Sequence, residues 1–425
     1  MTPVPGTAVV ITGTGVRTSV AEDTESFRTA LREGRCGTAR CSRTGPGEPA
    51  AGAELAAFDL AAALERRSGL SSGLRHSALR AARRAPLGIQ VAVVTALEAW
   101  ESAGLGRDGP PADRIGLVVA GSNLTGSYTE SLYPKLRAGR SYVPGRAALH
   151  LLDTDHVGVL SQVLDITGEG CTVGGASASG NVGIITGSRL LALRAVDVCL
   201  VVGALSELST LERQALFNLG VIAGGGDGDN PPVCAPFDED GGGTVPGQGC
   251  GALVLETRES ARRRQVPVLA EIAGYGLALD GNALADPDEN GEFRVMSAAL
   301  RMAGLSPEDV DYVNAHGTGT VLGDRTEAAA LRRLFGARPD GPWINATKAL
   351  TGHCLHAAGV VEAVATVVQM TGGFVHANVH LRRPVDAALR FAGRRAEPAH
   401  LAHALSNSFG FGGVGTSVLL SARSG

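Results

Sequence analysis

The sequence predicts a large, layered α/β fold, and two observations carry this prediction. Short apolar runs of strand length alternate with longer stretches that have helical character, and strands separated by helices indicate layered α/β architecture. The chain also contains two similar halves, a common sign of duplication. At 425 residues it is long enough for one large α/β unit or for two fused domains.

In the first half, the expected strands are Ala8–Ile11, Ile115–Val119, Val198–Val202 and Ala252–Leu255. The first strand is expected to end in a turn at Gly13-Thr-Gly15. Leu87–Ala103 is an amphipathic helical stretch, which Pro86 can open as its first helical residue. Gly180–Arg194 is small and aliphatic and indicates a buried helix. Residues 37–75, rich in Gly, Ala, Ser and Arg, are expected to form a surface insertion.

In the second half, the expected strands are Val268–Gly276, Tyr312–Asn314 and Trp343–Ala346, and the expected helices are Glu327–Phe335 and Ala357–Gln369. The strand at Val268–Gly276, with its Gly-Tyr-Gly, opens this half as the first strand opens the other. We therefore place the boundary near Arg258–Val266 and divide the chain into residues 1–257 and 258–425.

Composition excludes several classes of protein. A hydrophobic content of 44% and a charged content of 19% are ordinary for a soluble globular enzyme. A net charge of −4 gives no reason to expect nucleic acid or an anionic membrane as a partner. No basic region followed by an apolar run opens the chain, and no apolar stretch reaches membrane-spanning length. We expect a cytoplasmic protein.

The cysteines do not suggest a disulfide framework or a zinc site. There are seven of them, an odd number, and they are scattered without a CxxC pair. Most are expected to be small buried apolar residues. Metals and redox cofactors are not implied by the sequence.

Three segments carry a specific resemblance. They are Val313-Asn-Ala-His316-Gly-Thr-Gly-Thr320, then Lys348-Ala-Leu-Thr-Gly-His353 running into Ala357-Ala-Gly359, then Asn407-Ser-Phe409-Gly-Phe411-Gly-Gly413. In this order and spacing they resemble the β-ketoacyl synthases of fatty acid and polyketide assembly. The resemblance covers essentially the full length. It implies the thiolase fold, with two duplicated βαβαβαββ halves in five layers (αβαβα), and usually a homodimer.

The resemblance also implies a partner that brings the substrate. In this family the substrate arrives on the phosphopantetheine arm of an acyl carrier protein, so the protein itself is expected to bind no cofactor. No Pro/Gly-rich linker leads to another domain, so we expect a free-standing enzyme whose carrier protein arrives in trans. The densest basic stretch, Arg75–Arg84, is a candidate docking surface for an acidic carrier protein, or only a solvated helix face.

Ser177 stands where the family has its nucleophilic cysteine. The segment reads Gly174-Gly-Ala176-Ser177-Ala178-Ser179-Gly180, whereas the family has Ala-Cys-small-Ser. At the amino end of a buried helix, oriented N–H groups lower the pKa of a thiol. A serine hydroxyl is too weak an acid to be ionised in this way and needs a neighbouring base. Serine also favours the N-cap position of a helix, so Ser177 can be a cap that fills the nucleophile's place.

His316, His353 and Lys348 lie inside the matching motifs and are expected to be catalytic. Lysine occurs only at Lys135 and Lys348, so a retained lysine is informative. An ammonium group can be buried beside a carboxylate where a guanidinium would not fit. By resemblance Lys348 pairs with Glu362 on the next helix, and we interpret this pair as one that orients His353 and the pocket.

The remaining site residues follow from the resemblance. The N–H groups of Ser177 and Phe411 are expected to form the oxyanion hole, with the Phe411 ring gating the acyl pocket. Thr318 and Thr320 match residues that bind the phosphopantetheine arm. Asp324 and Glu327 are expected to be structural rather than catalytic.

One segment departs from the family pattern. Where the family commonly has Arg-Asp and then Gly-Glu-Gly, this chain has Gly241-Gly242 and Gly247-Gln248-Gly249. The loss of these charges is expected to weaken an internal ionic network. It puts in doubt either robust synthase activity or local rigidity.

The replacement of the family's cysteine by serine determines which of the family's reactions this protein is expected to retain. Decarboxylation of a malonyl thioester needs hydrogen-bond donors on the thioester oxygen, each typically contributing about 3–4 kcal/mol, and needs no nucleophile. The segments Val173–Asn181 and Leu208–Gly220 also resemble the serine-bearing synthase homologues of polyketide β-branching cassettes, which convert malonyl to acetyl carrier protein. We therefore predict a malonyl-carrier-protein decarboxylase.

Two alternatives remain open from the sequence. In the first, His316 activates Ser177 as a true nucleophile, which would make the protein an acyltransferase that forms esters or amides. In the second, the protein is a non-elongating partner subunit resembling a chain-length factor. Such subunits usually lack the full His/His/Lys set, which this chain keeps.

Overall fold

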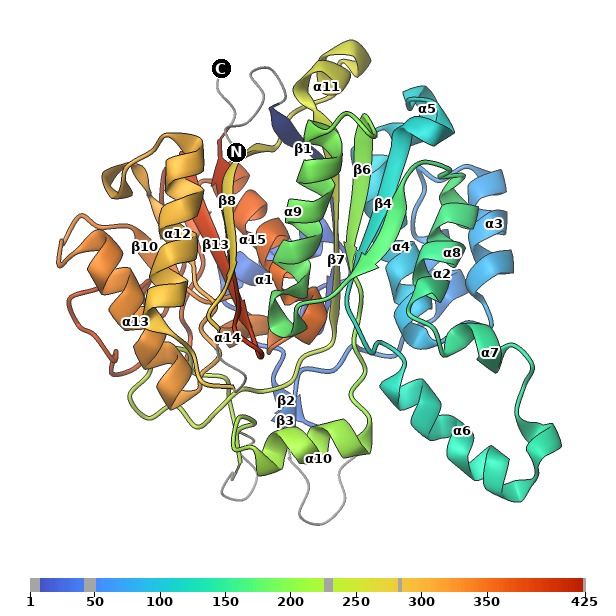
Figure 1. Ribbon diagram of the computed structural model, residues 1–425, viewed down its shortest axis with the longest axis horizontal. Helices are drawn as coiled ribbons and strands as arrows, with labels where there is room; N and C mark the ends of the chain where they lie inside the picture. The colour runs from blue at the N-terminus through green and yellow to red at the C-terminus, as the bar shows by residue number, and fades with distance from the viewer. Residues whose placement is uncertain (1–7, 42–50, 225–231, 282–284, 423–425) are drawn as a thin grey trace.

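The computed structural model describes residues 8–41, 51–224, 232–281 and 285–422 (Figure 1). A ten-stranded sheet runs through the molecule in the order β10-β9-β13-β14-β8-β1-β7-β6-β4-β5. Its strands are β1 (Val9–Thr18), β4 (Ile115–Ala120), β5 (Gly170–Val173), β6 (Val198–Gly203), β7 (Gly249–Thr257), β8 (Ala270–Leu279), β9 (Tyr312–Asn314), β10 (Trp343–Asn345), β13 (His403–Gly410) and β14 (Val414–Ser421). Two small pairs are separate, β2 (Ala39–Arg40) with β3 (Ala51–Gly52) and β11 (Phe374–Val375) with β12 (Glu397–Pro398).

The sheet consists of two halves with the same pairing pattern. In the first half β4 pairs in parallel with β5 and β6, and β7 pairs antiparallel with β6 and β1. In the second half β9 pairs in parallel with β10 and β13, and β14 pairs antiparallel with β13 and β8. A short antiparallel contact between β1 and β8 joins the halves. The duplication expected from the sequence is therefore present, whereas the division between residues 257 and 258 stays a prediction.

Some helices form layers on both faces of each half-sheet, and the others lie outside these layers (Figure 1). The helices are α1 (Thr24–Glu33), α2 (Leu60–Glu65), α3 (Ser72–Ala82), α4 (Leu87–Ser102), α5 (Leu105–Asp108), α6 (Gly126–Ala138), α7 (Ala147–His150), α8 (Thr154–Leu164), α9 (Ser179–Ala192), α10 (Thr210–Asn218), α11 (Arg258–Arg264), α12 (Glu289–Ala303), α13 (Val321–Phe335), α14 (Lys348–Thr351) and α15 (Ala358–Gly372).

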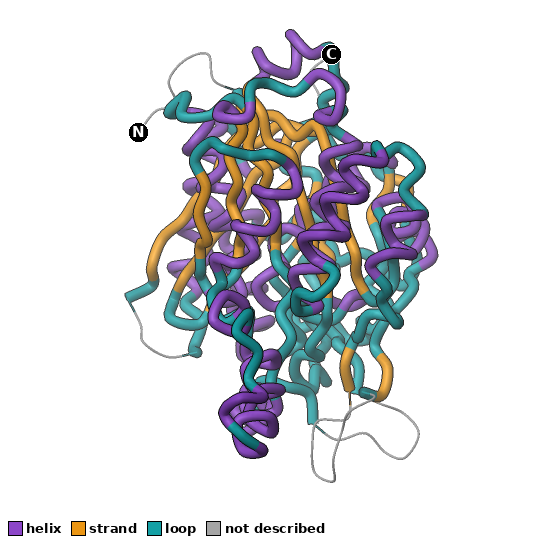
Figure 2. The backbone as a smooth tube through the Cα atoms, turned by 90° about the vertical axis from the view of Figure 1, so that its right-hand side faces the viewer, coloured by secondary structure: helices purple, strands orange, loops and turns teal. Residues whose placement is uncertain are grey.

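Two of these helices make up the central layer. Helix α9 contacts β4 and β6 of the first half and β13 and β14 of the second, and α15 contacts β7 and β13. Helix α4 covers the outer face of the first half and α12 that of the second. Figure 2 shows the strands running together through the molecule with helices around them. The arrangement is the expected five layers, and the almost wholly buried α15 is apolar because protein surrounds it.

The expected turn at Gly13-Thr-Gly15 is wrong, because β1 continues to Thr18. The glycines serve packing instead. A Cβ atom at Gly13 would lie 2.3 Å from the carbonyl oxygen of Ala99, and one at Gly15 would lie 2.2 Å from that of Thr95. Both carbonyls belong to α4, so the glycines allow this helix to pack directly on the strand. Pro86 precedes α4 as its N-cap and is not its first helical residue.

The surface insertion expected at residues 37–75 is also wrong for much of its length. Residues 42–50 lie outside the described residues, but α2 packs against α4. Leu60, Ala63 and Leu64 on α2 are buried in the core of the first half. The small and polar composition concealed this core face, because alanine and glycine pack tightly without giving a strong apolar signal.

The cysteines are free, and five of the seven are buried, as expected from the sequence. Within the part of the chain that the structure describes, no helix is long and apolar enough to cross a membrane. No group of three or more His, Cys, Asp or Glu side chains in the same residues could hold a metal ion.

Candidate active site

The expected site residues come from connections that follow four strands. Ser177 lies in a 3₁₀ turn, η3 (Ala176–Ala178), between β5 and α9. His316 follows β9, and His353 lies after β10 and α14, just before the 3₁₀ turn η5 (Leu355–Ala357) and α15. Phe411 lies in the tight turn between β13 and β14. Since β5 and β10 occupy equivalent places in the two halves, so do the segments of Ser177 and His353.

Helices α9 and α15 cross closely at their amino ends, which brings these two segments together. A Cβ atom at Gly180 would lie 2.5 Å from the backbone nitrogen of Val360, and one at Gly359 would lie 2.6 Å from that of Asn181. Neither contact is possible for a larger residue without moving a helix. The glycine at each crossing point therefore sets the distance between Ser177 and His353.

Ser177 contacts His353 rather than capping a helix. Its Oγ lies 2.8 Å from Nε2 of His353. Helix α9 has Ala178 at its N-cap position without a side-chain cap, so the interpretation of Ser177 as an N-cap is wrong. Ala176, directly before it, has φ of +47°, a left-handed conformation that costs a residue with a Cβ about 1–2 kcal/mol.

His356 stabilises this strained turn. Its Nδ1 lies 3.0 Å from the carbonyl oxygen of Ala176, to which it donates a hydrogen bond. Ser179 Oγ donates to the same carbonyl at 2.7 Å. Gly410, at the end of β13, packs so tightly against the turn that a Cβ there would lie 2.2 Å from the carbonyl oxygen of Gly175. The backbone at Ser177 is therefore held from two sides.

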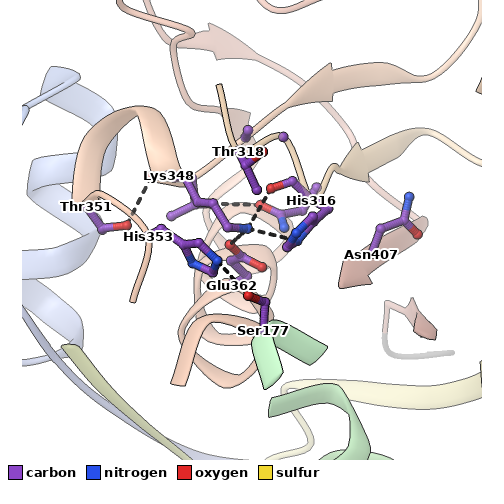
Figure 3. A network of polar contacts seen from close by, with 12 residues as sticks. Ser177, His316, Thr318, Lys348, Thr351, His353, Glu362 and Asn407 are labelled. Atoms are coloured by element: carbon purple, nitrogen blue, oxygen red, sulfur yellow. Dashed lines mark hydrogen bonds and ion pairs between the residues drawn. The ribbon is translucent and has the colours of Figure 1, made fainter. Parts of the chain in front are cut away.

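Lys348 makes three hydrogen bonds that use all its donors, two to His316 and one to Glu362 (Figure 3). Its Nζ donates to Oε1 of Glu362 at 2.5 Å, to the carbonyl oxygen of His316 at 2.6 Å and to Nδ1 of His316 at 3.3 Å. Lys348 and Glu362 are only 1% and 2% exposed. The expected pair is present, but its hydrogen bond to an imidazole is with His316 and not with His353.

The hydrogen bonds assign the proton of each imidazole. The N–H of Leu355 donates to Nδ1 of His353 at 3.1 Å, so in the neutral ring the proton lies on Nε2. Lys348 donates to Nδ1 of His316, so the same holds there. The ring centroids are 5.7 Å apart and the rings nearly perpendicular. The site thus has two Nε2–H donors close together.

Both imidazoles are neutral. Burial lowers the pKa of His316 and of His353 well below the ordinary value, and the nearby Lys348 ammonium lowers both further. A neutral imidazole donates a hydrogen bond without carrying charge, so these rings can stabilise negative charge that develops on a substrate.

Asp324 and Glu327 hold the loop that carries His316. Glu327 accepts the backbone N–H groups of His316 at 2.9 Å and Gly317 at 2.8 Å. Asp324 accepts those of Thr318 at 3.0 Å and Gly319 at 3.1 Å. Burial raises the pKa of Asp324 to about 7. These contacts agree with the structural role expected for the two carboxyl groups.

A cavity of about 440 Å³ connects the candidate residues. Ser177, His316, His353, Thr318 and Thr320 all line it, and Phe411 lines it while remaining 43% exposed. Thr318 Oγ1 lies 2.8 Å from Thr320 Oγ1. Lysine and arginine are absent from the described residues that line this cavity. The binding of a phosphopantetheine arm by the threonines, gating by Phe411 and the oxyanion hole of Ser177 and Phe411 stay predictions.

The residues that depart from the family pattern still make close contacts in or beside the site. Gly241 and Gly242 line the cavity, and a Cβ at Gly241 would lie 2.9 Å from the carbonyl oxygen of Gly319. Gln248 accepts the N–H of Leu55 at 2.9 Å, and its own N–H donates to Ala53 at 2.8 Å. The neutral amide therefore ties residues 53–55 to the site without an ionic network.

Sequence reasoning missed two polar residues of this region. His356 supports the Ser177 turn, and Glu292, on the first turn of α12, lines the cavity while almost completely buried. His356 belongs to the motif segment that follows His353, where its type could have been noticed. Glu292 lies in an acidic helix start that looks like ordinary N-terminal charge.

Comparisons with known proteins agree with the fold. Residues 7–261 match the family model "Beta-ketoacyl synthase, N-terminal domain", and residues 269–382 match "Beta-ketoacyl synthase, C-terminal domain". A protein of Bacillus subtilis (strain 168) named "Polyketide biosynthesis malonyl-ACP decarboxylase PksF" is 36% identical over 97% of this chain and 96% of its own. The 3-oxoacyl-(acyl-carrier-protein) synthase 2 of Coxiella burnetii is 30% identical over 97% and 98%.

The solved structures give the same picture. "The ishigamide ketosynthase/chain length factor" superposes with a TM-score of 0.86 at 27% identity, covering 99% of this chain and all of that one. A β-ketoacyl synthase from Burkholderia phymatum STM815 gives a TM-score of 0.85 at 27% identity, covering 98% of this chain and all of that one.

Proposed function

The chain belongs to the β-ketoacyl synthase family and has its thiolase fold, and we propose that it decarboxylates malonyl-loaded acyl carrier protein to acetyl-loaded carrier protein in polyketide biosynthesis. The observation that carries this proposal is the pair of neutral Nε2–H donors, on His316 and His353, in one cavity beside a serine. The relative from Bacillus subtilis bears the same activity in its name and is similar over nearly the whole chain.

The geometry supplies what loss of carbon dioxide requires. When the carbon–carbon bond to the carboxylate breaks, negative charge moves onto the thioester oxygen. The N–H of His316 can donate to that oxygen directly, and that of His353 can do so by exchanging its hydrogen bond to Ser177 for one to the substrate. Such donors lower the barrier by about 3–4 kcal/mol each. The substrate's phosphopantetheine arm belongs to the carrier protein, so the proposal includes no cofactor bound by this chain.

The charge of the cavity favours the same reaction. Its described lining residues include Asp280, Asp324 and Glu327 and no lysine or arginine. A malonyl carboxylate finds no cation to pair with there, so burying its charge costs free energy. Neutral carbon dioxide carries no charge and has no such cost. The environment therefore destabilises the carboxylate relative to the product of its loss.

The structure gives the acyltransferase alternative little support. A base for Ser177 must accept its proton, but the ring that contacts Ser177 is His353, whose Nε2 already carries a proton. The contact expected with His316 is not the one observed. Ser177 therefore accepts a hydrogen bond, which places an alcohol in the site without activating it.

Mass spectrometry of the carrier protein tests the proposed function directly. Incubation of malonyl-loaded carrier protein with this enzyme should remove about 44 Da from the carrier and leave the enzyme's own mass unchanged. An unchanged carrier together with acyl on the enzyme would move the protein to the acyltransferases. If neither mass changes, the protein is a partner subunit.

The Ser177→Ala variant should still decarboxylate. It removes an acceptor of the His353 N–H, a loss of about 1 kcal/mol, so we expect the rate to stay within about tenfold of wild type. The rate of conversion of the carrier, measured by intact mass, gives the result. Complete loss of activity, with acyl found on wild-type Ser177, would instead establish a nucleophile.

Carrier-protein docking remains to be located on the surface. Arg83 and Arg84 are exposed at the end of α3, which Figure 1 places at the right-hand edge, away from α10 and α13. Arg325 is exposed just after the first turn of α13, whose Val321 and Leu322 line the cavity.

Charge reversal separates the two surfaces. If the basic stretch of α3 is the docking surface, Arg83→Glu with Arg84→Glu should raise the KM for malonyl carrier protein about tenfold with kcat unchanged, because these charges meet an acidic partner. Arg325→Glu serves as the comparison. An effect confined to Arg325→Glu would show that the carrier docks at the cavity mouth and not on α3.

The assembly, location and pathway are finer proposals. We propose a homodimer in the cytoplasm, acting in β-branching of a polyketide. The homodimer is supported by a projecting arm, residues 126–152, which Figures 1 and 2 show extending from the body of the molecule. It carries exposed apolar side chains that favour a protein partner, namely Tyr133, Leu136, Tyr142, Leu149, Leu151 and Leu152.

A further inference from the structure

Glu292 is a buried carboxyl group in the wall of the catalytic cavity. It lies on the first turn of α12 and is 3% exposed. It lines the same cavity as His316, His353 and Ser177. Its Oε2 is buried without a hydrogen-bond partner among the described residues. An unpaired polar atom in this position costs free energy unless a ligand in the cavity uses it.

Packing places Glu292 on the side of the cavity where Phe409 lies beside His316. One helical turn further on, Met296 Sδ lies 3.3 Å from Nδ2 of Asn407 on β13. Residues four apart share a helix face, and residues two apart share a strand face. Helix α12 runs antiparallel to β13, so Glu292 lies level with Phe409. The Phe409 ring is 5.6 Å from the His316 ring, centroid to centroid.

The surroundings favour the protonated form of this carboxyl group. Burial raises the pKa of Glu292 well above its ordinary value, and the negative charges of Glu327, Asp280, Asp324 and Asp288 raise it further. Two cations lie near these carboxyl groups: Arg294 is 3.6 Å from Asp280, and the charge of Lys348 acts on Glu327. The raised pKa favours the protonated carboxyl group, which places an O–H donor in the wall of a cavity that also holds the two imidazole donors.

We propose that Glu292 is the proton donor that completes the reaction, an inference that rests on the proposed decarboxylation. The bond between the α-carbon and the carboxylate breaks and carbon dioxide leaves. The electron pair of that bond stays on the substrate, which becomes the thioester enolate. The O–H bond of Glu292 then breaks, and its proton forms the new C–H bond of the acetyl group. Water returns a proton to the Glu292 carboxylate before the next turnover.

The division of work between the three groups follows from their chemistry. His316 and His353 donate to the oxygen where charge appears, and keep their protons throughout. Glu292 gives its proton to carbon, where the enolate would otherwise wait for water or recapture carbon dioxide. General acids of this kind typically contribute a factor of about 10²–10⁴ to a rate.

Glu292→Gln tests the role with little change of shape. We expect conversion of malonyl carrier protein to fall by about 100-fold with KM unchanged. The proton transfer is followed separately by incubating acetyl carrier protein with the enzyme in D₂O, because the reverse step exchanges the methyl protons. Wild type should introduce deuterium, and Glu292→Gln should not. Glu292→Asp should recover part of the exchange.

A matched control lies on the same helical turn. Glu289 is half-exposed and pairs with Arg333, so Glu289→Gln should leave both readouts unchanged. Thermal unfolding checks the fold, and if Glu292→Gln is unfolded, the exchange catalysed by Glu292→Asp decides. Wild-type exchange in Glu292→Gln, at whatever rate it decarboxylates, would overturn the proposal. Wild-type enzyme that does not decarboxylate at all would instead contradict the proposed function.

Discussion

Replacement of His316 or His353 by alanine should lower the rate of decarboxylation by a factor of about 100–1,000, with little change in KM. Each substitution removes one Nε2–H donor from the place where the enolate oxygen forms. The imidazoles are neutral because burial and Lys348 lower their pKa values, so what is lost is a preorganised dipole and not a positive charge. The carrier's mass change with time gives the rate of each variant.

The exposed His400, between β12 and β13, provides the control for this experiment. His400→Ala should behave as wild type. Comparison with Ser177→Ala separates two effects. His353→Ala removes the N–H donor itself, whereas Ser177→Ala removes only the hydroxyl group that accepts from it. A His316→Ala enzyme that retains the wild-type rate would contradict the role of the paired donors.

Replacement of Lys348 by methionine should lower both stability and activity. The ammonium group makes three hydrogen bonds, and its removal leaves the Glu362 carboxylate buried without its partner. Breaking a buried pair typically costs about 3–5 kcal/mol. Burial already raises the pKa of Glu362 to about 7, so this carboxyl group can take up a proton, and we expect the lower end, about 3 kcal/mol.

The pH dependence of this loss distinguishes its cause. A carboxyl group whose pKa is raised in the folded state contributes stability below its unfolded pKa, and this stability is lost as pH rises through the folded value. Without Lys348 the folded pKa should rise further, so the difference in thermal stability between wild type and Lys348→Met should be larger at pH 8 than at pH 5. A difference that does not depend on pH would contradict an unpaired Glu362.

A second substitution separates stability from catalysis. Lys348→Met combined with Glu362→Leu removes both charges and should recover most of the thermal stability. Activity should stay low, because Nδ1 of His316 still lacks the donor that holds its proton on Nε2. Recovery of full activity in the double variant would show that Lys348 is needed only for folding.

The sequence by itself determined most of the architecture and indicated the main candidate site residues. Apolar runs gave β4, β6 and β9 nearly as they occur, because a strand buried on both faces needs a continuous apolar segment. The three motif segments indicated His316, Lys348, His353 and Phe411 as site residues through their resemblance to the family.

Local sequence patterns gave wrong predictions where a residue contacts a backbone group outside its own local segment. Gly13 and Gly15 suggested a turn, although they make room for α4. The helix predicted at Glu327–Phe335 begins earlier, at Val321. Asp324 and Glu327, which lie in it, accept hydrogen bonds from the preceding loop. In each case, the partner is a backbone group whose position the local sequence does not encode.

Only the tertiary structure decided which side chains meet in the site. It paired Ser177 with His353 and Lys348 with His316, where the sequence suggested the opposite pairs, and it brought Glu292 into the same cavity. Residue type and spacing specify strands, helices and candidate chemistry, because these depend on near neighbours in the chain. The contacts that choose between two histidines depend on where α9 and α15 cross, and that crossing is set by packing of the two halves.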